Sequence, residues 1–178
     1  TYYDGPAFVG LELGKATHGF VTRQVERVDA SGATIEPRRA QHDEHGNAVE
    51  LILPNGALDM TDNHRLVQTY DEAGLRLITA DLLLKDAAGP YILREDRVWD
   101  ERWGKVSSGT ERYIAGSGDD PGWTHAEYDE FGRIASKTDP GGDPSSPSAV
   151  YTYDVGPSRT RIISERRSVA DGPLDLKD

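Results

Sequence analysis

The 178-residue chain has no cysteine and only one methionine. The absence of cysteine excludes a disulfide scaffold, thiol catalysis and cysteine-ligated zinc, although it is compatible with any redox compartment. Long apolar runs are also lacking: the longest patches, such as Leu82-Leu83-Leu84, are strand-sized and far short of the roughly 18 to 20 residues of a membrane helix. We therefore expect no membrane span.

Basic residues are in the minority, with 20 Lys and Arg against 31 Asp and Glu and a net charge of −11. Because phosphate binding needs a concentrated positive surface, we expect no nucleic-acid partner. The first residues, 1–6, have neither the basic start nor the apolar middle of a signal peptide, so we expect the chain to be a fragment of a larger protein.

Four copies of a short motif recur through the chain, each with Asp-Glu followed by Gly. Their Asp positions lie 28, 29 and 29 residues apart, and a fifth, degenerate copy follows after 25. The Asp and Gly residues of the five copies are Asp43 and Gly46, Asp71 and Gly74, Asp100 and Gly104, Asp129 and Gly132, and Asp154 and Gly156. A fixed period of this kind predicts a repeat architecture.

The residue types at these positions predict hairpin turns. An Asp side chain at the first turn position accepts backbone N–H groups further along the turn, and Gly adopts the left-handed conformation that ends it. The aromatic residue before Asp is expected to pack across onto the outgoing strand. Alternating segments flank the turns, as in Val49, Leu51 and Leu53, and the period leaves room for one hairpin per repeat.

The sequence therefore predicts an all-β fold of consecutive antiparallel hairpins with little or no helix. The best helical candidate, Phe20 to Val28, has valines at helical spacing, but its β-branched residues favour a strand at least as well. Two Gly- and Pro-rich stretches, 115–122 and 139–147, are expected to be exposed loops.

Three segments resemble known proteins of one family. Tyr70 to Leu75 and Tyr128 to Ile134, the latter running on to Asp139-Pro140, resemble the YD repeats of Rhs proteins, although His42 and Trp99 replace the Tyr in two other copies. The stretch Tyr2 to Gly14 is similar to the segment that follows the β-propeller in the B component of insecticidal Tc toxin complexes.

The resemblance implies a curved sheet of Rhs type, with residues 1–40 as a shell-entry segment, 41–169 as hairpin repeats and 170–178 as a flexible tail. It implies a structural, secreted, non-catalytic protein whose partners are the rest of the shell, an enclosed toxin polypeptide and, through other regions, a translocation component. Because a cut-out piece exposes strand edges, we expect the fragment to self-associate. The alternative is an extracellular repeat module that binds a cell-surface glycan or protein.

Several residues have types that could support chemistry, but their pattern favours structure. The cluster from His42 to His45 lacks the spacing of a helical zinc motif and coincides with a turn. Acidic side chains recur at one turn position, as expected for exposed hairpin tips rather than for paired catalytic carboxylates; they are Glu44, Glu72, Glu101 and Glu130. We expect no catalytic residue, no metal site and no cofactor.

Two further groups have open interpretations. Trp99 and Trp103 flank one turn, which favours packing across a hairpin over a sugar-binding platform. The one cluster of basic residues indicates either a solvated face or a docking contact with an acidic neighbour. It consists of Arg159, Arg161, Arg166 and Arg167.

Overall fold

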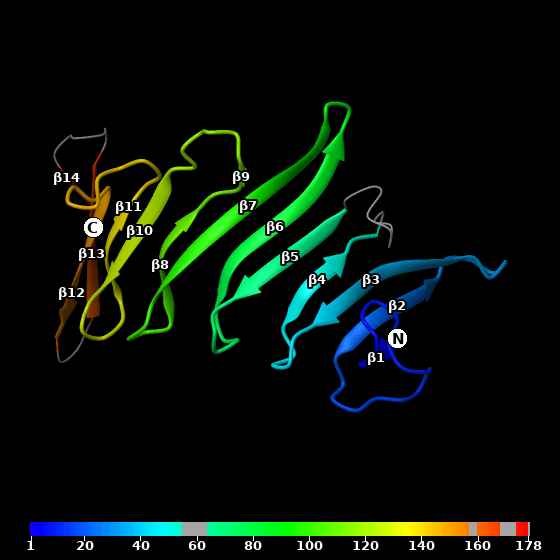
Figure 1. The fold of residues 1–178 in the computed structure, drawn as a ribbon. Helices are drawn as coiled ribbons and strands as arrows, with labels where there is room; N and C mark the ends of the chain where they lie inside the picture. Colours follow the sequence, from blue (N-terminus) through cyan, green and yellow to red (C-terminus); the bar gives the residue numbers. More distant parts are fainter. Residues whose placement is uncertain (55–63, 157–159, 168–173, 178) are drawn as a thin grey trace. The chain divides into compact units, whose positions relative to one another are not determined.

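A computed structural model of the chain describes residues 1–54, 64–156, 160–167 and 174–177. Within these residues the secondary structure is all strand and turn, with no helix (Figure 1). The strands are β1 (Tyr2–Tyr3), β2 (Val21–Arg27), β3 (Thr34–His42), β4 (Ala48–Ile52), β5 (Arg65–Tyr70), β6 (Leu77–Asp86), β7 (Gly89–Asp100), β8 (Lys105–Thr110), β9 (Tyr113–Ile114), β10 (Trp123–Tyr128), β11 (Ile134–Thr138), β12 (Ala149–Val155), β13 (Thr160–Arg167) and β14 (Leu174–Lys177).

The chain divides into two compact units. Unit 1 contains residues 1–94 and 114–117, and unit 2 contains residues 95–113 and 118–178. In unit 1 strands β1 to β6 pair in chain order, and in unit 2 the order is β8, β10, β11, β12, β13 and β14. The long strand β7 begins in unit 1 and ends in unit 2.

The predicted hairpins are confirmed. Neighbouring strands pair antiparallel, and each of the four full Asp-Gly motifs joins the two strands of one hairpin: β3 with β4, β5 with β6, β7 with β8, and β10 with β11. The segment that had helical spacing is strand β2. No helix of the described residues is long and apolar enough to cross a membrane.

Two of the boundaries expected from the sequence fall at strands. Strand β3 runs through residue 40, where Ala40 pairs with Leu51 of β4, and the two compact units divide near residue 94. Within the expected flexible tail, residues 174–177 form β14, whose backbone pairs with β13.

The two faces of unit 1 differ in chemistry, since residues paired across strands share a face. One face carries ion pairs, such as Glu50 with Arg65 and Asp81 with Arg94. It also carries a row of basic and apolar residues that pair across neighbouring strands: Arg23, Arg39, Ile52, Arg65 and Leu83. The opposite face carries an apolar row of Ala40, Leu51, Leu66 and Leu82.

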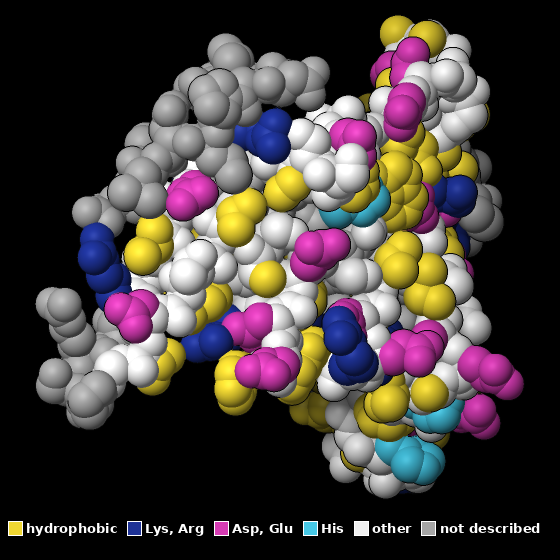
Figure 2. Space-filling model, turned by 90° about the vertical axis from the view of Figure 1, so that its left-hand side faces the viewer, with side chains coloured by type: hydrophobic (Ala, Val, Ile, Leu, Met, Phe, Trp, Pro, Cys, Tyr) yellow, Lys and Arg dark blue, Asp and Glu magenta, His cyan; other side chains and the backbone are white. Residues whose placement is uncertain are grey.

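Burial is sparse because the described strands of each unit form one layer. Among the hydrophobic side chains that the structure describes, only Ala40, Ile52 and Ala149 are buried. Large apolar side chains are exposed, including Leu75 at 80% and Phe131 at 67%. Figure 2 shows such side chains lying between charged ones on the surface that it draws. Each single layer therefore leaves apolar surface exposed.

Candidate functional site: the stacked Asp-Gly turns

The Asp of each of the four full motifs binds the backbone of its own turn. The Asp129 carboxylate accepts the N–H groups of Phe131 and Arg133, both at 2.9 Å. Gly132 has a φ of 72° and donates its N–H to the Asp129 carbonyl at 3.0 Å. This left-handed conformation costs a residue with a side chain about 1–2 kcal/mol, which explains the glycine.

The same geometry recurs in the other full copies. Asp43 accepts N–H groups from His45 and Asn47, Asp71 from Leu75 and Arg76, and Asp100 from Arg102. Positive φ values close all three turns, at Gly46, Gly74 and Gly104.

The fifth copy is different. Asp154 lies inside β12, where it pairs with Arg161. The tip that follows Gly156, residues 157–159, lies outside the described residues. The degenerate motif lacks the second acidic residue, and its Asp continues the strand instead of opening a turn.

Turns stack in pairs through the glycine of the later turn, the first turn on the second in unit 1 and the third on the fourth in unit 2. A Cβ built on Gly74 would lie 2.2 Å from Cδ2 of the His45 ring, and one built on Gly132 would lie 2.8 Å from Cε3 of Trp103. His45 and Trp103 each immediately precede the glycine of their own turn. Trp103 therefore packs on the next hairpin, whereas we expected it to pack across its own.

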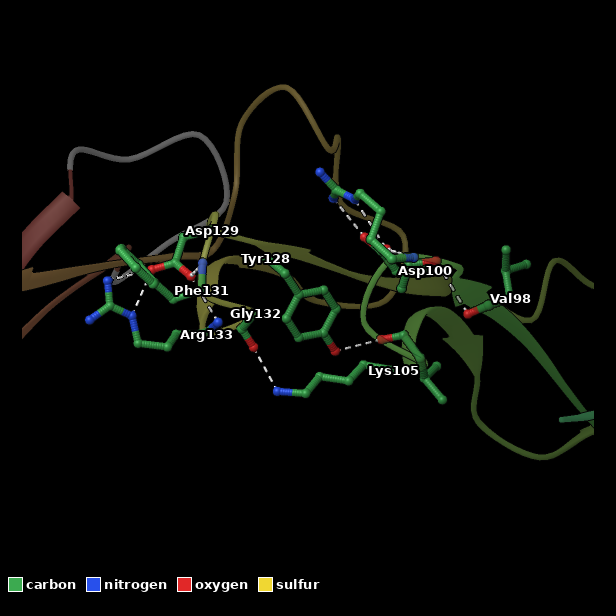
Figure 3. A network of polar contacts seen from close by, with 11 residues as sticks. Val98, Asp100, Lys105, Tyr128, Asp129, Phe131, Gly132 and Arg133 are labelled. Carbon is green, nitrogen blue, oxygen red and sulfur yellow. Dashed lines mark hydrogen bonds and ion pairs between the residues drawn. The ribbon is translucent and has the colours of Figure 1, made fainter. Parts of the chain in front are cut away.

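Polar side chains add a second link between neighbouring turns. The residue after one turn glycine donates to the carbonyl of the next turn glycine: Asn47 Nδ2 to Gly74 at 2.7 Å, and Lys105 Nζ to Gly132 at 2.6 Å (Figure 3). Both bonds span 27 residues. The same linkage in both units shows that it belongs to the repeat.

The tyrosine before Asp makes the third link. Strands β8 and β10 pair only from Trp123 to His125, and beyond that point the Tyr128 hydroxyl donates to the Val106 carbonyl at 2.8 Å (Figure 3). In the next repeat the Tyr153 hydroxyl donates to the Ile134 carbonyl at 3.0 Å. The hydroxyl thus supplies a donor to the preceding hairpin where strand pairing has ended, a role that the residue type alone did not indicate.

A cation accompanies each of these two tyrosines. Lys105 Nζ lies 5.5 Å from the centre of the Tyr128 ring, and the Arg133 guanidinium carbon lies 4.1 Å from that of Tyr153. Both cations immediately follow a turn glycine. Cation–π attraction of this kind is worth about 0.5–1 kcal/mol at an exposed site.

Removing these hydroxyls tests the third link. We expect Tyr128→Phe and Tyr153→Phe each to lower the free energy of unfolding by about 1 kcal/mol, because each removes one hydrogen bond to a backbone carbonyl. Urea unfolding measures the effect. Tyr151→Phe is the control, because Tyr151 lies on the same strand as Tyr153 but outside the motif; an equal loss there would contradict the link.

The turn carboxylates predict sensitivity to acid. Backbone N–H donors, first that of Leu75, hold the pKa of Asp71 below its usual range. A hydrogen bond from the Arg102 side chain does the same for Asp100. For Asp129, burial raises the pKa, but the bonds from Arg133 outweigh it and the pKa is lowered.

A lowered native pKa means that the unfolded chain binds protons first as the pH falls. The stability due to these carboxylates is fully present above their ordinary pKa of about 4 and is lost as the pH falls through the lowered native values. We expect the urea midpoint to fall progressively below about pH 4.5. Asp71→Asn should lower the urea midpoint at pH 7 and weaken its dependence on pH. If the midpoint of the variant depends on pH as strongly as that of the parent chain, the Asp71 carboxylate is not a source of the acid sensitivity.

Among the residues that the structure describes, the other candidate side chains are not gathered at one site. His42 lies against Phe20 and His45 against Gly74, so the two imidazoles of the cluster contact different neighbours. Within the described part of the chain no group of three or more His, Asp or Glu side chains is placed to hold a metal ion. The recurring glutamates are exposed on successive turns.

The arginine cluster is divided between the two faces of β13. Arg161 and Arg166 point to opposite sides of β13, since their positions on the strand differ by five and side chains alternate between the two faces. Arg167 donates to the Pro147 carbonyl at 3.0 Å. Arg159 lies outside the described residues.

No protein-family model and no curated protein matches this chain. The stacked turns and the single-layer sheet are therefore the observations on which a function has to rest.

Proposed function

We propose that the chain is a segment of the wall of an Rhs-type shell, secreted and non-catalytic, that encloses a toxic polypeptide. The observation that carries the proposal is the repeat-to-repeat linkage at the turns. A ring of one turn packs on the glycine of another turn, and a side chain donates to the carbonyl of that glycine. A tyrosine hydroxyl donates to a strand carbonyl of the preceding hairpin. Each of these contacts joins one hairpin to its neighbour. A linkage made only between neighbours lets a wall be extended by adding repeats.

The single layer supports the same proposal. A hairpin wall pairs every strand edge except the outermost ones, and the exposed apolar side chains, such as Leu75, Phe131 and Val155, require cover from other parts of a larger assembly. The curvature needed to close such a wall is part of the proposal.

The test uses the complete protein that contains this chain. Native protease digestion followed by mass spectrometry should leave a domain-sized segment outside the repeats intact, and that segment should show rapid amide hydrogen exchange, because an enclosed chain is sheltered from protease without being folded. Unfolding the wall in urea should expose it to cleavage. A segment that is cleaved at once under native conditions, or one that exchanges slowly as a folded domain does, would overturn the proposal.

The recognition alternative makes a different prediction. A module that binds cell-surface glycans should give signals above background on a glycan array with the isolated chain, and a wall segment should not. Array binding that free glycan inhibits would support recognition of a glycan and contradict enclosure.

A further inference from the structure

Residues 4–20, here named the N-terminal strap, precede the first Asp-Gly motif and lie against the first hairpin of unit 1. The two ends of the strap are joined, since Asp4 N–H donates to the Phe20 carbonyl at 2.8 Å. In its middle the Phe8 N–H donates to the carbonyl of Ala40 in β3 at 3.0 Å. The strap is therefore fixed both to itself and to the sheet.

A buried carboxylate holds the last residues of the strap. Asp4, which is 7% exposed, accepts the backbone N–H groups of Thr17, His18, Gly19 and Phe20 at 2.6 to 3.0 Å. Hydrogen bonds to an ionised acceptor are roughly twice as strong as those between neutral groups. Asp4 therefore fixes the backbone that carries Phe20, although it lies 16 positions earlier in the chain.

The strap places the Phe20 ring on the first turn. A Cβ built on Gly46 would lie 2.5 Å from Cε1 and Cζ of that ring, and in the same unit a Cβ on Gly74 would lie 2.2 Å from the His45 ring. Phe20 thus lies on Gly46 as His45 lies on Gly74. His45 belongs to the turn one repeat earlier, whereas Phe20 precedes the first motif, which begins at Asp43.

A ring over the turn glycine is not a property of the turn alone. Gly104 closes the third turn with a φ of 60°, but a Cβ built there would meet nothing within 4 Å. The turn therefore forms whether or not a ring lies on its glycine. The ring on Gly46 has to come from another segment, and the strap provides it.

Two imidazoles contact the Phe20 ring. It stacks on His18 of the strap, with ring centres 5.6 Å and planes 15° apart, and it lies 5.5 Å from the ring of His42, the last residue of β3. Aromatic pairs add attraction beyond the burial of their area. These contacts therefore favour an aromatic ring over an aliphatic side chain at this position.

The path of the strap is fixed at two strained residues. Asp4 and Phe8 have φ values of 46° and 63°, in a left-handed region that residues with side chains rarely adopt. Such a conformation persists only where surrounding contacts hold it. Asp4 is held by its hydrogen bonds, and the Phe8 ring lies 5.8 Å from the guanidinium carbon of Arg65 in β5.

We propose that the N-terminal strap is the terminal cap of the turn stack in unit 1, which consists of the turns at residues 43–46 and 71–74. Through Phe20 the strap provides the ring that a preceding repeat would provide, and it occupies the surface on which the turn of such a repeat would stack. Stacked repeats need caps because the outer surface of an end repeat has no neighbour. Asp4 is a positioning residue for Phe20. The cap goes beyond the proposed function, because it does not depend on what the complete protein encloses.

Amide hydrogen exchange of the 178-residue chain tests the cap. In Phe20→Ala the first-turn amides of Gly46 and Asn47, which both bond to Asp43, should lose about tenfold in protection, because opening of the turn no longer breaks the ring contacts. Amides of the fourth turn in unit 2 should change by less than about twofold. Unchanged protection of the first turn overturns the cap.

Ring-matched variants separate a ring contact from space filling. Phe20→Tyr keeps the ring, and Phe20→Leu keeps an apolar side chain without one. The first-turn amides should be protected in Phe20→Tyr as in the parent chain, and they should exchange in Phe20→Leu as fast as in Phe20→Ala. Equal protection in the Tyr and Leu variants overturns the role of the ring.

Asp4→Ala tests the positioning role. The first-turn amides should lose protection by about the same factor as in Phe20→Ala, and in a Phe20→Ala background the second substitution should add little, because both act through one ring. Losses that add in full overturn this role of Asp4.

A measurement on the parent chain applies even if these variants fail to fold. The Phe20 ring protons should give nuclear Overhauser effects to the α protons of Gly46, and the ring current should displace the chemical shifts of those α protons. The α protons of Gly104, whose Cβ position is open, serve as the reference. Gly46 α protons that show neither effect overturn the cap.

Discussion

Replacing Gly132 with alanine is expected to lower the stability of unit 2 by about 2–5 kcal/mol. The left-handed backbone contributes about 1–2 kcal/mol, and the overlap of the new Cβ with the Trp103 ring about 1–3 kcal/mol. Urea unfolding followed by tryptophan fluorescence measures the loss. The ring lies on the site of the substitution, so the emission of the folded state should also change.

Gly104→Ala is the matched control. Gly104 has a φ of 60°, but a Cβ there would meet nothing within 4 Å. The control should therefore lose only the backbone contribution, about 1–2 kcal/mol. The entropy that alanine removes from the unfolded chain is the same for both variants and cancels in the comparison.

A double variant separates ring contact from backbone strain. In a Trp103→Ala background the cost of Gly132→Ala should fall to that of Gly104→Ala, because the overlapping ring is gone. Equal costs for Gly132→Ala and Gly104→Ala in the parent chain would contradict the stacking of turns.

Ile52→Ala is expected to destabilise unit 1 by about 2–5 kcal/mol. Ile52 is 1% exposed, and it lies in register between Arg39 and Arg65. Long arginine stems cover apolar neighbours while their charged ends stay polar, and Phe8 of the strap lies over Arg65. Deleting most of the Ile52 side chain leaves a cavity beneath these groups. Thermal or urea unfolding measures the cost.

Ile35→Ala provides the comparison for the same residue type. Ile35 lies on β3 and is 52% exposed. Its replacement should cost about 1 kcal/mol or less, mainly through strand preference. Similar losses at the two positions would show that the strap side of unit 1 is not a packed surface.

The three links between turns explain why the motif contains Tyr, Asp and Gly together. Asp and Gly build a turn within one hairpin, and Tyr and the residues beside Gly connect that hairpin to its neighbour. A substitution at Asp therefore acts locally, whereas one at Tyr128 acts on the junction between repeats.

Part of this architecture was predictable because it depends on local chemistry. An Asp whose carboxylate reaches N–H groups two to five residues away and a Gly with positive φ need only their own turn. The period of the motif therefore located four turns and the hairpins that they close. Alternating segments identified the strands in the same way. Alternation did not show which face is covered: Leu51 is half-buried, whereas its neighbour Ile52 is almost fully buried.

Contacts between distant residues could not be read from the same pattern. The ring that lies on Gly74 comes from a residue 29 positions earlier, and the carboxylate that binds residues 17–20 comes from Asp4. The sequence by itself determined the all-β hairpin repeat, because turns and strands follow from neighbouring residues. Only the tertiary structure decided how turns stack, what buries Ile52 and how the strap closes on Gly46, because those contacts depend on strand register across hairpins.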